Sequence, residues 1–169
     1  MTYDWSRFDI FFYYNVPVED VYRAWGSVKG LESFILDRAS FHSQDDLPRK
    51  GSELVEAGDE YEWTWRHQYT LKGKIISVVM GRELHFTFGD MEVKIHFSES
   101  DNITEIHLEQ FNIPETDDGR VFGHLNCRSC WIFFMTNLKS VLEDGKDLRD
   151  SSPGRVSSME VGFMPPVIK

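Results

Sequence analysis

The last third of the chain carries an apolar pattern that is typical of one long helix. Between Asp118 and Asp144, apolar residues recur at steps of three and four, the spacing that places side chains on one face of an α-helix. Residues 116–118 offer side-chain oxygens to the first amides, and Gly145 suits the left-handed residue that ends a helix. Such a helix is about 40 Å long, so its apolar face needs a broad apolar surface against it. That face comprises Val121, Phe122, Leu125, Trp131, Phe134, Leu138, Val141 and Leu142.

The chain before this helix contains short β-rich runs that can supply the surface. Residues 59–66 alternate, with Tyr61, Trp63 and Trp65 on one side, as expected of a half-buried antiparallel strand. Two short helices, at 17–26 and 29–36, are predicted after the first strand. We therefore predict an α+β fold, in which a curved antiparallel sheet of about seven strands wraps around a long C-terminal helix. The other strands are expected at 8–16, 38–42, 68–80, 83–88, 92–97 and 103–112.

The length of the chain indicates one domain. A chain of 169 residues suits a single hydrophobic core, and we place the domain at residues 1–150. The remaining residues, 151–169, are rich in Ser, Pro and Gly but end in apolar side chains. We expect this tail to be extended or partly disordered, or to lie as an arm across this subunit or a neighbour.

Charge and hydropathy exclude several classes of partner. The formal net charge of −10 argues against nucleic acid and anionic membranes, because both bind positively charged surfaces. The N-terminus lacks the positive and apolar segments of a secretory signal. The longest apolar run, Trp131–Met135, is far too short to span a bilayer. We expect a cytoplasmic protein without membrane or nucleic-acid partners. No glycine-rich phosphate loop occurs, and we predict no cofactor.

Cys127 and Cys130 form a CxxC motif within the predicted long helix. A reactive thiolate is stabilised at the start of a helix rather than in its interior, which disfavours a redox role. A tetrahedral zinc site needs two more ligands, and the sequence has no second CxxC and no HxxxH. His124, one turn away, is the nearest candidate. We therefore predict that the two thiols pack on the helix face and that there is no metal site.

Several motifs occur in a characteristic order along residues 8–149. They are residues 16–25 (VPVEDVYRAW), Gly58 with Trp63 and Trp65, Gly73-x-Ile75-x-x-Val78, Leu84-x-Phe86-x-Phe88, Thr104-x-Ile106-x-Leu108, and Cys130-Trp131 with Leu138-Lys139 and Leu142-Glu143. Together they resemble the START-like (SRPBCC, helix-grip) superfamily. The chain is more closely similar to the family built on the C-terminal domain of the activator of the heat-shock-protein-90 ATPase.

This resemblance implies a deep apolar pocket between the sheet and the long helix. Members of the superfamily mostly bind hydrophobic small molecules, while some are cyclases or hydratases and others bind protein partners. The chain departs from the family pattern at Phe34-Ile35, at Cys130 and at Ile103, where the family usually has Trp-Phe, Gly and Gly. These changes alter the shape of the cavity, so the ligand of a relative is not carried across.

The inner faces of the predicted strands and helices provide candidate ligand-binding residues. Two polar side chains share this inner phase: His67 follows Trp63 and Trp65, and Gln110 follows Leu108. His85, His96 and His107 have the opposite phase and should face water. The predicted cavity lining is Trp25, Phe34, Phe41, Trp63, Trp65, His67, Phe86, Phe97, Leu108, Gln110, Cys127, Trp131 and Phe134.

We favour non-catalytic binding of a small hydrophobic or aromatic molecule in this cavity. One alternative is a chaperone-interacting module, which the resemblance suggests and for which the acidic surface could meet a basic groove. A second alternative is a cyclase- or hydratase-like enzyme in which His67 or Gln110 polarises a bound carbonyl. A lone inward His is more often a hydrogen-bonded core residue, so we predict no catalytic residue. We also expect a homodimer, because one helix stripe cannot cover the whole of Trp131–Met135.

Overall fold

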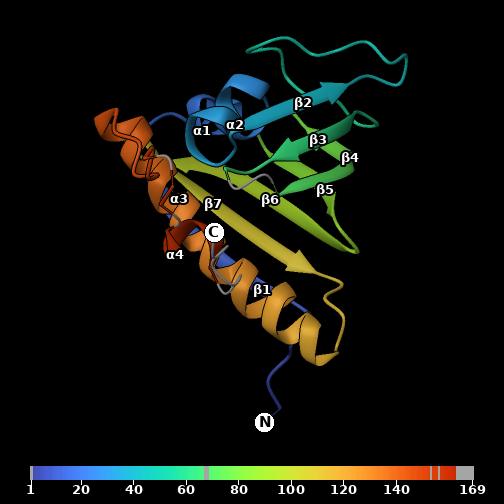
Figure 1. Cartoon of the computed structure of the whole chain (residues 1–169). Coiled ribbons are helices and arrows are strands. Elements are labelled where there is room, and N and C mark those ends of the chain that lie inside the picture. The colour runs from blue at the N-terminus through green and yellow to red at the C-terminus, as the bar shows by residue number, and fades with distance from the viewer. Residues whose placement is uncertain (1, 67–68, 153, 156, 163–169) are drawn as a thin grey trace.

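The protein folds into one curved antiparallel sheet with helices on its concave face, as the computed structural model of residues 2–66, 69–152, 154–155 and 157–162 shows (Figure 1). The seven strands follow the order β1-β7-β6-β5-β4-β3-β2. The strands are β1 (Phe8–Tyr14), β2 (Arg38–His42), β3 (Glu60–Thr64), β4 (Thr70–Val79), β5 (Glu83–Phe88), β6 (Met91–Ser100) and β7 (Ile103–Phe111). The predicted α+β arrangement, with its seven strands, is confirmed.

Two short helices follow β1, as predicted. They are α1 (Val18–Trp25) and α2 (Val28–Phe34). Helix α2 is capped by Ser27, whose hydroxyl oxygen accepts a hydrogen bond from the amide of Gly30 at 3.1 Å. Both helices stand at one end of the sheet, beside the upper end of the last long helix (Figure 1).

The last helix differs from the continuous α-helix that the sequence predicts. It begins as a π-helix, η1 (Gly119–Asn126), and continues as the α-helix α3 (Cys127–Asp144). Gly145 ends it with a left-handed φ of 67°, as predicted. Because a π-helix closes its hydrogen bonds over five residues, side chains three and four apart no longer share one face. Val121, Phe122 and Leu125 are consequently 39%, 44% and 40% exposed instead of forming the start of a buried stripe.

Two glycines explain the close packing of the π-helix. A Cβ atom at Gly119 would lie 1.9 Å from the carbonyl oxygen of Pro114. A Cβ atom at Gly123 would lie 2.9 Å from the side chain of Ile113 and 3.1 Å from the sulfur of Met91. The backbone therefore approaches β6 and the segment after β7 more closely than any larger residue would permit.

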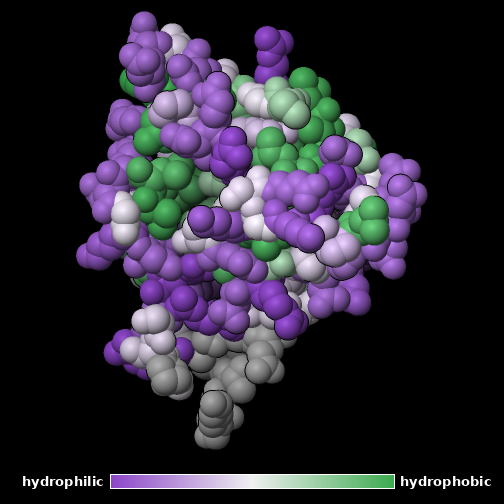
Figure 2. Space-filling view, turned by 90° about the horizontal axis from the view of Figure 1, so that it is seen from above, coloured by the Kyte–Doolittle hydropathy of each residue, from purple (hydrophilic) through white to green (hydrophobic). Residues whose placement is uncertain are grey.

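The core lies between the concave face of the sheet and the helices α1, α2 and α3. Its aromatic rings mesh at the end of the sheet that carries α1 and α2: Tyr61 stacks on Trp63 at 4.1 Å, and Trp63 meets Phe86 at 5.2 Å. Viewed from above this end, the molecular surface is mostly polar, and apolar side chains reach it in separate patches (Figure 2). Among the described helices, none combines the length and apolar character needed to cross a bilayer.

The described part of the predicted tail lies against the last helix. It contains one short helix, α4 (Ser158–Val161), which packs on α3 (Figure 1). A Cβ atom at Gly162 would lie 2.1 Å from the side-chain oxygen of Asn126 and 3.0 Å from the sulfur of Cys130. The close approach at Gly162 places this segment beside the junction of η1 and α3.

Candidate ligand-binding pocket

A pocket of about 490 Å³ lies between the sheet and the last helix, beside the turn that joins β3 to β4. This volume falls within the range of about 300–1,000 Å³ that is typical of small-molecule sites. Its lining residues come from the β3–β4 and β5–β6 turns, from the junction of η1 and α3, and from the short tail helix α4. The lining comprises Ile35, Trp65, Arg66, Tyr69, Leu71, Phe88, Gly89, Met91, Phe122, Gly123, Asn126, Cys127, Cys130, Trp131, Phe134 and Glu160.

Aromatic rings form a continuous part of the pocket wall. The ring of Trp131 lies 5.3 Å from that of Phe88, which in turn lies 6.2 Å from Trp65. Trp65 contacts Tyr69 at 5.6 Å across the β3–β4 turn. This turn is closed by a hydrogen bond from the amide of Trp65 to the carbonyl of Tyr69 at 2.9 Å. Rings with these spacings present flat apolar surfaces to a guest molecule.

The side chain of Gln110 holds the deeper end of this wall in place. Its oxygen accepts a hydrogen bond from the indole nitrogen of Trp131 at 2.7 Å. Its amide nitrogen donates to the carbonyl of Gly123 in the π-helix at 2.8 Å and contacts the sulfur of Met91 at 3.2 Å. Gln110 is fully buried, so these bonds replace the water that its amide would otherwise need. It thereby joins β7 to both halves of the last helix.

The predicted lining residues divide into two groups in the structure. Four of them, Trp65, Cys127, Trp131 and Phe134, line the pocket. Eight others are buried in the core outside the pocket wall, where the aromatic members pack against neighbouring rings. These eight are Trp25, Phe34, Phe41, Trp63, Phe86, Phe97, Leu108 and Gln110. His67 lies outside the described residues.

Several lining residues were not among the sequence candidates. Phe88 shares a strand phase with Phe86, so the alternation of β5 contains the signal that could have identified it. Arg66 and Tyr69 sit in a turn, where periodicity carries no information about direction. Glu160 belongs to the tail and had no sequence signal, because its place depends on how α4 packs on α3.

The two cysteines lie in the pocket wall as free thiols. Burial raises the pKa of Cys130 to about 12, and the neighbouring Cys127 adds to this effect. Burial also raises the pKa of Cys127, although a hydrogen bond with Gln110 opposes the change. Both groups are therefore neutral thiols at pH 7, which makes them part of the apolar wall and poor nucleophiles.

His124 does not complete a metal site with the cysteines. Its ring nitrogens are engaged by the hydroxyl of Tyr3 at 2.8 Å and by the carbonyl of Trp5 at 3.1 Å. Burial lowers the pKa of His124 below the ordinary value of 6.5. Its contacts thus attach the segment before β1 to the π-helix.

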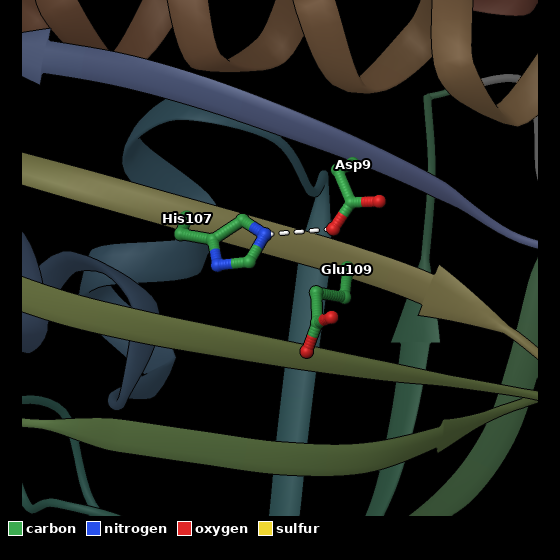
Figure 3. A group of neighbouring side chains, drawn as sticks. All are labelled: Asp9, His107 and Glu109. Carbon is green, nitrogen blue, oxygen red and sulfur yellow. Dashed lines mark hydrogen bonds and ion pairs between the residues drawn. The ribbon is translucent and has the colours of Figure 1, made fainter.

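Histidines on the outer face of the sheet pair with carboxylates. Among the described residues, one group could offer a metal three ligands within 4.8 Å of one another: Asp9, His107 and Glu109 (Figure 3). Asp9 and His107 are already 2.8 Å apart. The guanidinium of Arg7 lies 2.6 Å from Glu109 and 3.4 Å from Asp9, and so supplies the positive charge that a metal would bring. We assign no metal to this cluster.

The other two outer-face histidines have the same kind of partner. His85 lies 2.7 Å from Glu92, and His96 lies 3.5 Å from Glu83 and 3.6 Å from Glu109. Both project from the side of the sheet opposite the core, as their strand phase predicts. Neither of them lines the pocket.

Solved structures with the same fold come from several bacteria. The protein SSP2350 from Staphylococcus saprophyticus is 22% identical with a TM-score of 0.65, over 85% of this chain and 98% of that one. The Aha1 dimer from Colwellia psychrerythraea is 17% identical with a TM-score of 0.66, over 83% of this chain and 98% of that one. No curated protein matches the chain.

At these identities the solved structures establish the fold, a helix-grip arrangement of sheet and long helix. The sequence itself matches the model of one family, described as Activator of Hsp90 ATPase homolog 1-like protein, over residues 15–143. This match spans the chain from the end of β1 to the last turn of α3. The chain therefore belongs to the Activator of Hsp90 ATPase homolog 1-like protein family.

Proposed function

We propose that this protein binds a small apolar or aromatic molecule in the pocket between the sheet and the last helix, without a chemical step. The observation that carries the proposal is a cavity of about 490 Å³ beside an otherwise closely packed core. Three rings in its wall, those of Trp65, Phe88 and Trp131, lie within about 6 Å of their neighbours. Such a wall favours flat or aliphatic guests over polar ones.

The apolar surface that a guest would bury is sufficient for useful affinity. Burying about 300 Å² of apolar ligand surface contributes roughly 7 kcal/mol. Apolar contacts from the pocket side add to this, while lost translational and rotational freedom offsets part of it. Dissociation constants in the micromolar range are therefore expected.

A direct test is to measure binding of apolar and aromatic compounds by native mass spectrometry and by fluorescence. Trp65 and Trp131 lie in the wall, so a bound guest should change the tryptophan emission. Leu71→Trp places a larger ring in the pocket and should weaken binding at least about tenfold. Val79→Trp, on the same strand but exposed and outside the pocket, is the matched control and should leave affinity unchanged. Unliganded protein with every compound would refute the proposal.

The residues considered for the cyclase- or hydratase-like alternative, and the thiols of the pocket wall, offer little support for an enzyme. Gln110 lies outside the pocket wall, and both ends of its amide are engaged within the protein. His67, the other candidate, is not among the described residues. The thiols of Cys127 and Cys130 are held neutral by burial, which raises the pKa of each. We therefore keep binding without turnover as the proposed role.

A second proposal is interaction with a chaperone ATPase, favoured by the family match over residues 15–143. The net charge of −10 would suit a basic docking surface on the partner. The test is ATP turnover by a purified Hsp90-type chaperone with and without this protein. A concentration-dependent change in rate supports the interaction, whereas an unchanged rate together with no complex in gel filtration excludes it.

We also propose that the protein self-associates through the exposed side of the last helix. Leu125 and Ile132 lie seven residues apart on this helix and are 40% and 36% exposed. The related structure from Colwellia psychrerythraea is described as a dimer. Light scattering should give twice the chain mass of 19.8 kDa, and Leu125→Glu should restore the monomer value. A monomer mass for the unaltered protein would rule this out.

A further inference from the structure

The pocket has one charged end. Of its described lining residues, Arg66 and Glu160 alone carry a charge at neutral pH, and the rest are apolar, aromatic or uncharged. Arg66 comes from the turn between β3 and β4, whereas Glu160 comes from α4 in the C-terminal tail. The two residues are 94 positions apart in sequence (160 minus 66), so only the folded tail brings them together.

The contact between these two side chains is loose. The Nη1 atom of Arg66 lies 3.9 Å from Oε1 of Glu160, and it donates a hydrogen bond to the carbonyl of Asp150. The other carboxylate oxygen of Glu160 accepts from the amide of Asp150 at 3.2 Å. A guanidinium and a carboxylate in their best arrangement form two parallel bonds of about 2.7–2.9 Å. This pair in the pocket wall is therefore not the bidentate arrangement that both groups favour.

The carboxylate of Glu160 is nevertheless almost withdrawn from solvent, since its side chain is 6% exposed, while that of Arg66 is 29% exposed. A carboxylate is buried at a cost unless a cation compensates it, and Arg66 is the cation present. The segment that carries Glu160 is short, because α4 has four residues. A hydrogen bond of 3.9 Å from the thiol of Cys130 to the Glu160 carbonyl also holds it, and Gly162 at its end lies against Asn126 and Cys130.

We propose that the ligand of this pocket is an apolar or aromatic carboxylic acid, whose carboxylate binds Arg66 in place of Glu160. This inference rests on the proposed binding function and names its ligand class. The apolar body of the acid lies against Trp65, Phe88 and Trp131, and its carboxylate accepts two hydrogen bonds from the guanidinium. In the unliganded protein the carboxylate of Glu160 then occupies the place of the ligand carboxylate beside Arg66. When the acid binds, α4 moves away from Arg66 together with Glu160.

The charge of the protein makes Arg66 the decisive residue. With a net charge of −10 the molecule as a whole repels anions. A neutral guest gains nothing from Arg66, whereas an anionic guest is admitted only if Arg66 is available to it. The two charged residues therefore have opposite effects on the affinity for an acid. Arg66 raises this affinity, whereas Glu160 lowers it by competing for the guanidinium of Arg66.

The experiment compares two probes of the same shape, 1-naphthaleneacetate and 1-naphthaleneacetamide, by isothermal titration calorimetry with the full chain at pH 7.5. The unaltered protein should bind the acid at least about tenfold more tightly than the amide. Glu160→Gln should raise the affinity for the acid several-fold and leave that for the amide unchanged. Glu60→Gln, which removes an exposed carboxylate in β3, is the matched control for net charge and should change neither affinity.

Arg66→Gln should abolish the preference for the acid while the amide still binds. Arg66→Lys keeps the positive charge but loses the planar guanidinium that can donate two parallel hydrogen bonds, so it should retain part of the preference for the acid. Should Arg66→Gln fail to fold, the comparison of Glu160→Gln with the unaltered protein still tests whether the pocket prefers an acid. Equal binding of acid and amide, unaffected by Glu160→Gln, would overturn the acid inference and leave the proposed binding function intact. Absence of binding by both probes, and by the wider panel of apolar compounds, would overturn both.

Discussion

The indole nitrogen of Trp131 and the side-chain oxygen of Gln110 lie 2.7 Å apart, and this bond ties the pocket wall on α3 to strand β7. Gln110 also holds the carbonyl of Gly123, so one buried amide orients the wall and the π-helix together. Buried networks of this kind rigidify a site when every member is satisfied. The apolar pocket thus depends on a polar residue outside it.

Replacement of this amide tests its structural role. Gln110→Leu leaves the Trp131 N–H and the Gly123 carbonyl without partners, and should lower the free energy of unfolding by about 1–3 kcal/mol. Urea denaturation followed by circular dichroism measures the change. Gln44→Leu, at an exposed position where the amide makes one hydrogen bond of 3.3 Å to the carbonyl of Ala57, is the comparison and should cost less than about 1 kcal/mol. Equal effects of the two substitutions would contradict the role assigned to Gln110.

A buried ion pair anchors the long loop between β2 and β3. Arg49 makes two hydrogen bonds to Asp59, at 2.9 and 3.0 Å, and the side chain of Asp59 is 2% exposed. Arg49→Met leaves a buried carboxylate without its cation and should lower the free energy of unfolding by about 3–5 kcal/mol. Arg7→Met breaks the exposed pair with Glu109 and should cost less than about 1 kcal/mol. A similar loss in both variants, measured by urea denaturation, would show that burial of the pair is unimportant.

The pocket cysteines should react slowly with a thiol reagent. With the pKa of Cys130 raised to about 12, roughly one thiol in 10,000 is ionised at pH 8. We expect DTNB to modify the native protein at least about 100-fold more slowly than the protein in urea, with the rate still rising beyond pH 9. Cys130→Ser reports the rate of Cys127 alone. A native rate equal to the unfolded rate would show that these thiols are not in the wall.

The stability of the protein should depend on the protonation of His124. Because the pKa of His124 is lowered on folding, the unfolded state takes up a proton first as the pH falls. The free energy of unfolding should therefore be unaffected above pH 7 and decrease as the pH drops below about 6.5. Denaturation curves at pH 7.5 and 5.5 would show a larger loss for the unaltered protein than for His124→Gln, which cannot titrate. Identical losses in the two proteins would exclude a contribution from this residue.

Much of the fold could be predicted because its signals are local. The strands predicted at residues 38–42 and 83–88 are β2 and β5, with the bounds that the structure has, and the second shows clear alternation. Pro17 and Gly26 marked the ends of α1, and Gly145 marked the end of α3. Each of these signals arises within a few residues, where backbone geometry and side-chain direction are coupled.

The π-helix could not be predicted in the same way. Its sequence has apolar residues at ordinary helical spacing, and the wider turn depends on Gly119 and Gly123 meeting Pro114, Ile113 and Met91. These partners lie outside the helix, so the spacing of residues within the helix cannot predict the contacts with them. Phe122, which lies between these two glycines, lines the pocket.

The sequence by itself determined the seven strands, the two short helices and the extent of the last helix, because periodicity is a property of neighbouring residues. Tertiary structure alone decided which inner side chains close into a core and which remain around a cavity. Trp63 and Trp65 have the same phase, yet one is buried among rings and the other lines the pocket. Trp63 is enclosed by Phe41, Tyr61 and Phe86, whereas Trp65 lies beside Tyr69 at the β3–β4 turn. Such contacts join residues that are far apart in the chain, so periodicity within one strand does not determine them.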